Sequence, residues 1–395
     1  MEPVHKVKTA VVGCGMISNI YLMNLTKLFS IIDLVAVCDV SRSSAEEKAK
    51  VYGIGQVMTI DEVAADKTIE MVVNLTPPKV HYDVIKTMLL AGKHVFTEKM
   101  LTDDFAKAEE LVALATEKGL YLGVAPDVVL GAGLQTARHA IEIGLIGRVT
   151  SCVAAVARNQ SLNSELFGFL RQPGGALPYD VGIYYVAAML SLLGPMSDVS
   201  AFGQEAPPHR AQLLFKGNAN EEWTVPGYNL FASTLRFKCG AIGTLLLDGN
   251  AAVIDESTFT IYGTEGMLRL GDPNRFDSAV ELVRSESGAC ILPHTHGYNG
   301  SSVFPDACGY QQRYGSRGVG AAEMAWALRT GRPNRCSKEY GLHCMEVLHG
   351  MGVSAKTGTV FQPKSSFTMR PLASGYYSTM LEGIERGDAE RSLIE

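Results

Sequence analysis

The sequence has few of the features that mark secreted, membrane or nucleic-acid-binding proteins. Its 8 cysteines are scattered without a C-x-x-C pair, which indicates buried free thiols in a reducing cytosol rather than a disulfide framework. No basic block is present, and the net charge of −6 disfavours nucleic acid or an anionic membrane as partner. No apolar run reaches membrane-spanning length, and the first strand begins too close to Met1 for a signal peptide. We therefore expect a cytoplasmic protein that binds neither membrane nor nucleic acid.

The chain is too long for one ordinary domain, with 395 residues of which 47% are hydrophobic. Up to about residue 125, apolar strands alternate with amphipathic helices, which is typical of a parallel, doubly wound α/β sheet. The expected strands are 7–12, 34–38, 69–75, 93–96 and 120–124, and the expected helices are 16–25, 41–51, 80–90 and 103–118. We predict a Rossmann domain over residues 1–125.

The remainder, residues 126–395, has a different pattern. Short strands are joined by glycine-containing links, which indicates an antiparallel or mixed sheet in a second, α+β domain. The expected strands are 149–157, 228–238, 243–247, 259–262 and 267–270, and the expected helices are 133–142, 181–193, 321–329 and 338–356. Residues 294–317 are rich in glycine, serine and aromatics with weak periodicity, and are expected to form a long loop.

A glycine turn follows the first strand. Gly13 permits a bend that a Cβ would obstruct, and Gly15 lets a pyrophosphate lie against the backbone. The helix that begins at Met16 and Ile17 would point its free N–H groups at the phosphates. Ser18 replaces the usual third glycine but is still small. This pattern predicts a dinucleotide site, and the alternative is an ordinary structural turn.

An acidic residue ends the second strand. Asp39 lies at the usual distance to accept hydrogen bonds from an adenine ribose, and its charge would repel a 2′-phosphate. We therefore expect NAD, while nearby Arg42 keeps NADP possible. The alternative is that Asp39 only caps a helix.

Two further strands end in polar residues, where ligands of open parallel sheets bind. Thr76-Pro77 ends one, and Glu98-Lys99 ends the other. Lys99 is therefore placed near a nicotinamide, where burial and a cationic ring would lower its pKa and suit it to proton transfer. From position alone, a surface Glu–Lys pair is an equal alternative.

A second polar group follows Gly174-Gly175. Asp180 lies near the start of the expected helix, and Tyr184 lies four residues later on the same face. A phenol beside an ammonium group can act as acid or base, because the cation stabilises the phenolate. A helix cap at Asp180 and a core tyrosine are the alternative. His294-Thr295-His296 could start a metal site, but the sequence places no third ligand nearby, so no metal is expected.

Taken together, these segments resemble the Gfo/Idh/MocA oxidoreductases over nearly the whole chain. The matching segments are 13–18, Thr76-Pro77 with His81, 91–95 with Glu98-Lys99, Gly174-Gly175 with 180–184, 262–266 and 330–333. Met100 departs from the family, which usually has proline there, and Tyr184 stands where many members have histidine. Residues 125–127 replace the commoner Asn-Arg-Arg.

The resemblance implies a Rossmann domain followed by a domain with a large open, mostly antiparallel sheet that commonly mediates oligomers, here a homodimer or homotetramer. It implies Lys99, Asp180 and Tyr184 as catalytic residues. The cofactor-binding residues expected are Gly13, Gly15, Met16, Ile17, Asp39, Arg42, Thr76, Pro77, His81, Glu98 and Lys99.

The function that follows is an NAD(P)-dependent oxidoreductase. It would transfer hydride between nicotinamide and a secondary alcohol or ketone of a sugar, polyol or glycoside. Two alternatives remain open, an NAD-dependent glycosidase that oxidises its sugar transiently and a non-catalytic NAD(P) sensor.

Overall fold

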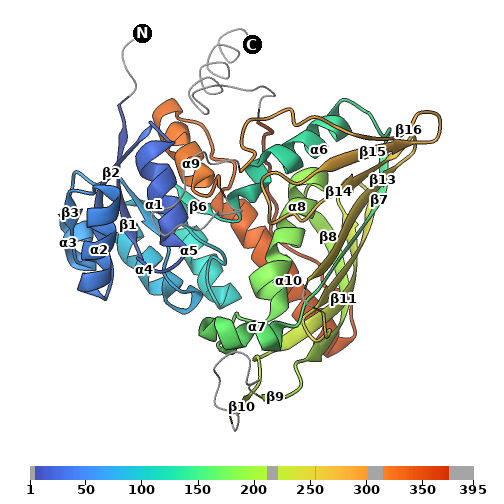
Figure 1. Cartoon of the computed structure of the whole chain (residues 1–395), viewed down its shortest axis with the longest axis horizontal. Helices are drawn as coiled ribbons and strands as arrows, with labels where there is room; N and C mark the ends of the chain where they lie inside the picture. Colours follow the sequence, from blue (N-terminus) through green and yellow to red (C-terminus); the bar gives the residue numbers. More distant parts are fainter. Residues whose placement is uncertain (1–4, 211–220, 254, 301–314, 373–395) are drawn as a thin grey trace.

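The computed structural model describes residues 5–210, 221–253, 255–300 and 315–372. In these residues two large sheets are joined by a layer of helices (Figure 1). The smaller sheet, in blue at the left of the view, is formed by the N-terminal part of the chain, and the larger one forms the right-hand edge (Figure 1). The two-sheet architecture predicted from the sequence is thus confirmed.

The smaller sheet has six parallel strands in the order β3-β2-β1-β4-β5-β6. This is the strand order of a dinucleotide-binding Rossmann fold. Its strands are β1 (Val7–Val12), β2 (Ile32–Cys38), β3 (Gln56–Val57), β4 (Met71–Asn74), β5 (His94–Thr97) and β6 (Leu122–Val124). Its helices are α1 (Ser18–Lys27), α2 (Arg42–Tyr52), α3 (Ile60–Ala65), α4 (Pro78–Leu90) and α5 (Phe105–Glu117).

The strand sequences explain why this sheet lies inside the protein. All four residues of β4 are buried, and β1 is interrupted only by an exposed Lys8. Continuous apolar strands suit a parallel sheet that helices cover on both faces. The order reverses between β1 and β4, so the ends of β1, β4 and β5 lie together at the edge where Rossmann folds bind ligands.

The larger sheet has eight strands in the order β16-β15-β14-β13-β7-β12-β11-β8, and every pairing except β7 with β12 is antiparallel. Its strands are β7 (Val149–Ala157), β8 (Met196–Glu205), β11 (Tyr228–Phe237), β12 (Ile242–Asp248), β13 (Glu256–Gly263), β14 (Met267–Leu270), β15 (Val280–Arg284) and β16 (Gly288–Ile291). β9 (His209–Arg210) and β10 (Glu222–Trp223) form a separate pair.

Among the described residues, helices pack against one face of the larger sheet and leave its other face bare (Figure 1). The strands alternate between buried and exposed residues, as β11 shows along its length. The helices of this part are α6 (Ala132–Glu142), α7 (Gln160–Leu166), α8 (Ile183–Leu193), α9 (Val319–Thr330) and α10 (Lys338–Thr357), with shorter turns η1 (Asp127–Leu130), η2 (Gly168–Arg171) and η3 (Pro178–Gly182). All eleven residues of α8 are buried, so this helix forms the centre of the shared core.

The last two helices return to the first sheet. α9 contacts β5 and β6, and Gly341 of α10 packs so closely on Val124 that an added Cβ would lie 2.6 Å from its side chain. The change of sheet between β6 and β7 agrees with a boundary near residue 125, but the division into residues 1–125 and 126–395 stays a prediction.

Several elements differ from the sequence expectation. The first helix begins at Ser18 rather than Met16. The helix expected over 181–193 starts as a π-helical turn that contains Asp180. Strands β3, β8, β9, β10, β15 and β16 and helices α3 and α7 were not predicted. β16 is exposed throughout and β8 carries serine and aspartate among its apolar residues, so neither shows the apolar alternation that signals a strand. Residues 301–314 of the loop expected over 294–317 lie outside the described residues.

Candidate active site

The glycine turn after β1 lies directly against the end of β4. Gly13 has φ of +104°, and a Cβ there would lie 2.7 Å from the main-chain carbon of Leu75. A Cβ on Gly15 would meet no atom within 4 Å. Gly13 is therefore required by the fold, whereas Gly15 borders open space in which a phosphate could approach the backbone.

The carboxylate of Asp39 holds this turn from the end of β2. Its two oxygens accept hydrogen bonds from the backbone N–H of Cys14 at 2.7 Å and of Ser41 at 2.8 Å. Val40, which follows Asp39 in the chain, is completely exposed, and Met16, which follows the glycine turn, is 75% exposed. Exposed apolar side chains next in sequence to an acidic residue and a glycine turn fit an adenine nucleotide.

The expected residues around this turn differ in their surroundings. Ile17 is 37% exposed and precedes α1 without a side-chain cap. The backbone N–H groups of Ser18 and Asn19 donate to the carbonyl oxygens of Gly15 and Met16, at 3.1 and 3.4 Å. Arg42 donates to Glu46 at 2.9 Å on the exposed surface of α2. A phosphate would therefore compete with Glu46 for Arg42, which is the cation that the sequence analysis placed near Asp39.

His81 connects the loops that follow β4 and β5. Its ring is fully buried, with Nδ1 2.6 Å from the carbonyl oxygen of Met100 and Nε2 2.6 Å from that of Thr76. Burial lowers the pKa of His81, partly offset by these carbonyl contacts. The structure therefore gives His81 the role of fixing Thr76-Pro77 and Lys99-Met100 relative to one another, since each of its nitrogens faces a main-chain carbonyl oxygen and the neutral ring donates to one of them. The Lys99–Met100 peptide bond is cis.

Glu98 also points into the protein. Its Oε1 accepts from the hydroxyl of Tyr21 in α1 at 2.6 Å, and its Oε2 accepts from the backbone N–H of Lys99 at 3.0 Å. Glu98 is 7% exposed, and its hydrogen bonds connect the loop of Lys99 to α1.

Lys99 and Asp180 meet although 81 positions separate them in the sequence. The ammonium of Lys99 donates to Oδ1 and to the main-chain oxygen of Asp180, both at 2.8 Å. Burial alone would lower the pKa of Lys99, but Asp180 and Tyr184 outweigh it, and the pKa is raised. The lowered pKa expected from the sequence refers to Lys99 beside a cationic nicotinamide ring, so it stays a prediction. Burial works in the opposite direction on Asp180, whose pKa is nevertheless lowered by Lys99.

The position of Asp180 comes from the π-helical turn at the start of α8. Single π-turns occur frequently at functional sites because they reorient one side chain. Gln160 of α7 donates to the second carboxylate oxygen of Asp180 at 3.3 Å. Asp180 is therefore a side chain held by two neighbours rather than a simple helix cap.

Tyr184 completes the group that the sequence predicted. The ammonium of Lys99 lies 5.5 Å from the centre of its ring, and the residue is 6% exposed. Burial raises the pKa of Tyr184, while Arg317 and Lys99 act against that rise. Lys99, Asp180 and Tyr184 are thus brought together at the end of β5.

Arg317 belongs to the same group and was missed by sequence reasoning. Its Nη2 donates to the hydroxyl of Tyr184 at 3.1 Å, and its Nη1 lies 3.6 Å from Oδ1 of Asp127. Asp127 also accepts from the backbone N–H of Gly318 at 2.8 Å. Arg317 follows a glycine-rich stretch with no periodicity, so only the three-dimensional contacts reveal it.

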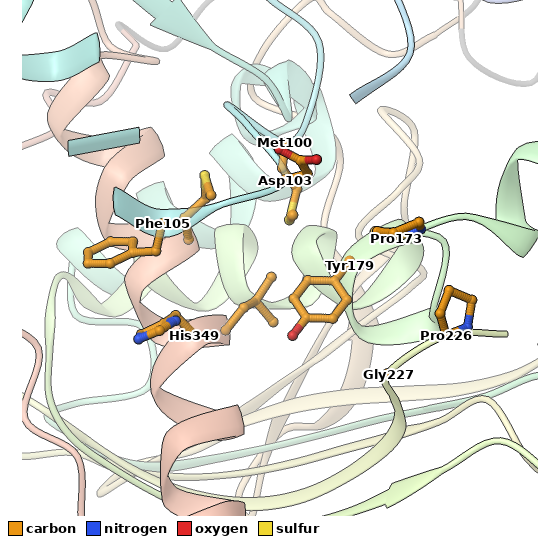
Figure 2. A pocket seen from close by; sticks show the side chains of 11 residues that line it. Met100, Asp103, Phe105, Pro173, Tyr179, Pro226, Gly227 and His349 are labelled. Carbon is orange, nitrogen blue, oxygen red and sulfur yellow. The ribbon is translucent and has the colours of Figure 1, made fainter. Parts of the chain in front are cut away.

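A pocket of about 260 Å³ adjoins the loops that carry Lys99 and Asp180. Figure 2 shows Phe105 and His349 on one side of it, Tyr179 facing them, and Pro173 and Pro226 on the other side. Neither Lys99, Asp180 nor Tyr184 lines this pocket. The pocket therefore lies beside these three residues and is not the space that their side chains share.

The histidine pair considered for metal binding makes other contacts. Nε2 of His294 lies 3.1 Å from the carbonyl oxygen of Ser278, and Nε2 of His296 lies 3.1 Å from that of Leu372. Within the described ranges, no three His, Cys, Asp or Glu side chains are grouped to hold a metal ion. Of the helices in that part of the chain, none has the length and apolar character needed to span a bilayer.

Comparison with protein families gives two matches along the chain. Residues 7–125 match the model described as an oxidoreductase family with an NAD-binding Rossmann fold, GFO_IDH_MocA. Residues 134–269 match the C-terminal domain model of the same family.

Relatives and solved structures agree with these matches. An uncharacterized oxidoreductase of Schizosaccharomyces pombe is 33% identical over 216 residues, which span 53% of this chain and 58% of the relative. A dTDP-3,4-didehydro-2,6-dideoxy-alpha-D-glucose 3-reductase of Streptomyces antibioticus is 27% identical over 65% of this chain and 74% of its own. A levoglucosan dehydrogenase solved with NADH and L-sorbose has a TM-score of 0.76 at 19% identity, covering 90% of this chain and 98% of that one.

Proposed function

Because the chain belongs to the Gfo/Idh/MocA oxidoreductase family, we propose that it oxidises or reduces a secondary alcohol or ketone of a sugar, polyol or glycoside with NAD. The observation that carries the proposal is the convergence of Lys99, Asp180 and Tyr184 at the carboxyl end of β5. The end of β5 lies beside the strand-order reversal, where nicotinamide cofactors of this fold bind.

The residues at the ends of β1 and β2 would hold the nucleotide. Gly13 and Gly15 would provide the turn, Met16 and Ile17 precede the helix that would face the phosphates, and Asp39 would face the adenine ribose. Thr76, Pro77 and Lys99 would border the nicotinamide. Bound NAD supplies the acceptor or donor of hydride. We propose NAD over NADP, because Arg42 is paired with Glu46.

The chain's own contribution is to hold the substrate oxygen and move its proton. Asp180 takes two of the three ammonium hydrogen bonds of Lys99, which leaves one for the substrate oxygen. The hydroxyl of Tyr184 would exchange a proton with that oxygen, helped by the cation of Lys99. His81 and Glu98 would act indirectly, by fixing the loops on which these groups lie.

The substrate class is supported by what the relatives are named for. One is a reductase of a nucleotide-linked deoxysugar, and a structural neighbour is a levoglucosan dehydrogenase. A lysine, a carboxylate and a phenol suit a polyhydroxylated substrate, because each bonds hydroxyl groups. We also propose a cytoplasmic location, which seven unpaired described cysteines support, although Cys239 and Cys290 are exposed rather than buried.

We further propose that two chains associate through the bare face of the larger sheet. One row across this face runs from Phe202 through Ala232, Leu246 and Ala155 to Thr258, without a charge. Exposed apolar side chains on the same strands are Phe202, Val153, Ile242 and Tyr262. A large apolar face on a soluble domain is typical of a subunit interface.

The decisive experiment is a screen of sugars, polyols and glycosides with NAD and with NADP. Cofactor reduction and product release are followed in the same sample. We expect NADH to form in step with oxidised sugar. Release of an aglycone without net NADH would favour the glycosidase alternative, and tight NAD binding without turnover across the panel would favour the sensor alternative.

A further inference from the structure

The guanidinium of Arg317 is held by groups from separate parts of the chain. Besides Tyr184 of α8, its Nη2 donates to Oδ1 of Asn274 at 2.7 Å, and its Nη1 faces Asp127 of η1. The main-chain oxygen of Arg317 accepts from the side chain of Asn24 in α1 at 2.7 Å. With 3% exposure and these fixed contacts, the arginine has little freedom to move.

The hydrogen bond between Arg317 and Tyr184 has only one possible direction. Arginine has no acceptor, so the phenolic oxygen of Tyr184 accepts and its own proton is left for another group. Among the described residues, this is the one hydrogen bond that the Tyr184 hydroxyl makes. A tyrosine whose proton is free in a buried site is arranged as an acid, and its phenolate as a base.

Two cations from different parts of the fold lie near the Tyr184 ring. The guanidinium carbon of Arg317 lies 5.2 Å from the ring centre, and the ammonium of Lys99 lies 5.5 Å from it. Glu98 and Asp180 are the nearby anions that act against them. Lys99 is already paired with Asp180, so Arg317 is the cation that bonds the phenolic oxygen itself.

We propose that Arg317 is the positioning residue that makes Tyr184 the acid–base group of the reaction, an inference that rests on the proposed function. In the oxidative direction, the substrate O–H bond breaks and its proton joins the phenolate oxygen of Tyr184, which becomes a phenol. The carbon gives its hydride, with the electron pair, to the oxidised nicotinamide of the proposed function, and a carbonyl forms. Arg317 stabilises the phenolate before the transfer and releases no proton itself.

The experiment compares Arg317→Gln, which removes the charge, with Arg317→Lys, which keeps it. Tyrosine labelled with ¹³C at Cζ reports the titration of each phenol by NMR, and Tyr184→Phe identifies the signal of Tyr184. We expect the midpoint of Tyr184 in Arg317→Gln to move upward by about one pH unit or more, since one charge at this distance accounts for a shift of that order. In Arg317→Lys the midpoint stays nearer to that of the wild type.

The same variants are assayed with the best sugar of the panel, for which levoglucosan, myo-inositol and D-xylose are the first probes. The rising limb of kcat against pH moves upward in Arg317→Gln by the same amount as the NMR midpoint, while KM changes little. Arg335→Gln is the matched control, because Arg335 is equally buried but pairs with Glu323 instead of Tyr184. It is expected to lower the melting temperature without moving either midpoint.

The outcomes separate the two proposals. If both midpoints stay in place in Arg317→Gln, Arg317 has only a structural role and this inference is wrong. If the wild type turns over no sugar, the proposed function fails, whereas the NMR titration still decides whether Arg317 sets the acidity of Tyr184. If Arg317→Gln does not fold, Arg317→Lys decides in its place. Lysine keeps the positive charge, so a strongly displaced Tyr184 midpoint in Arg317→Lys would contradict the argument that the charge sets the acidity of Tyr184.

Discussion

The ammonium of Lys99 lies 2.8 Å from both the carboxylate Oδ1 and the main-chain oxygen of Asp180. This pair joins the end of β5 to the π-turn that begins α8, and so connects the Rossmann sheet with the helical layer of the second sheet. Both side chains are less than one fifth exposed, so removing either partner would leave a buried charge without its counterion. The pair proposed to act in catalysis therefore also connects the two parts of the fold.

Replacing Lys99 by alanine tests its role in the reaction. We expect kcat to fall by about 10²–10⁴-fold, the usual contribution of a positioned acid–base group, with NADH affinity close to wild type. Stability also falls, because the carboxylate of Asp180 is left buried without its cation. Stopped-flow or steady-state assays at controlled folded fraction, together with NADH fluorescence titration, measure these effects.

Lys93→Ala is the matched control for this variant. Lys93 lies just before β5, is 4% exposed, and its ammonium donates to the carbonyl oxygen of Ile69 at 2.9 Å. Its loss costs stability at the opposite end of the strand, far from the catalytic group. Activity per folded molecule is expected to remain. Full turnover by Lys99→Ala would remove Lys99 from the mechanism.

Replacing each of the two turn glycines by alanine is expected to show that one is needed for folding and the other for cofactor binding. In Gly13→Ala, the Cβ meets the backbone of Leu75 at a strained φ, so unfolding becomes easier by about 1–3 kcal/mol. In Gly15→Ala, the Cβ meets no protein atom, so stability changes by less than about 0.5 kcal/mol. The new methyl group nevertheless occupies the approach of the pyrophosphate and weakens NAD binding by about tenfold or more.

Thermal unfolding and isothermal titration with NAD measure the two effects. Gly55→Ala is the control, since a Cβ there also meets nothing within 4 Å and lies away from the turn. Unchanged NAD affinity in Gly15→Ala would show that the dinucleotide does not lie on this turn.

The buried carboxyl of Asp127 predicts a pH dependence of stability. Burial raises its pKa from 3.8 to about 6, against the opposing effect of Arg317. Between these two values the folded state binds a proton that the unfolded state has lost, so this group makes stability fall as pH rises from about 4 to 6. Below 3.8 both states are protonated and this dependence disappears.

Asp127→Asn removes this titration. We expect the free energy of unfolding of the wild type to fall relative to that of the variant as pH rises from 4 to 7. Denaturant melts along that range measure the difference. A difference that stays constant over the range would show that Asp127 does not titrate there.

The sequence predicted those parts of the site that local patterns encode. Gly13, Asp39 and Lys99 each follow an apolar strand, and strand ends of a parallel sheet meet at one edge, so their neighbourhood could be inferred. Asp180 and Tyr184 were predicted as a pair through helical spacing, and their approach to Lys99 followed only from the family resemblance. The contact itself depends on how α8 packs, which no local pattern encodes.

Arg317 and Asp127 show where sequence reasoning ends. They are separated by 190 positions, and each is surrounded by residues without helical or strand periodicity. Their pairing arises because the segment before α9 packs on η1, and backbone N–H groups of Gly318 and Gly320 fix the carboxylate. Such contacts depend on tertiary packing, so the structure is needed to find them.

The bare face of the larger sheet predicts how the chains associate. Phe202 is 81% exposed at the centre of β8, and it belongs to the uncharged row that crosses five strands. Phe202→Glu places a charge on this face and is expected to shift the protein toward monomers at micromolar concentration, because burying an unpaired carboxylate opposes association. Light scattering coupled to size-exclusion chromatography measures the molar mass.

Leu90→Glu is the control, because Leu90 is also well exposed, at 57%, but ends α4 on the other side of the fold. An identical molar mass for the wild type and Phe202→Glu would place the interface elsewhere, whereas a smaller mass for Phe202→Glu alone would locate it on the sheet.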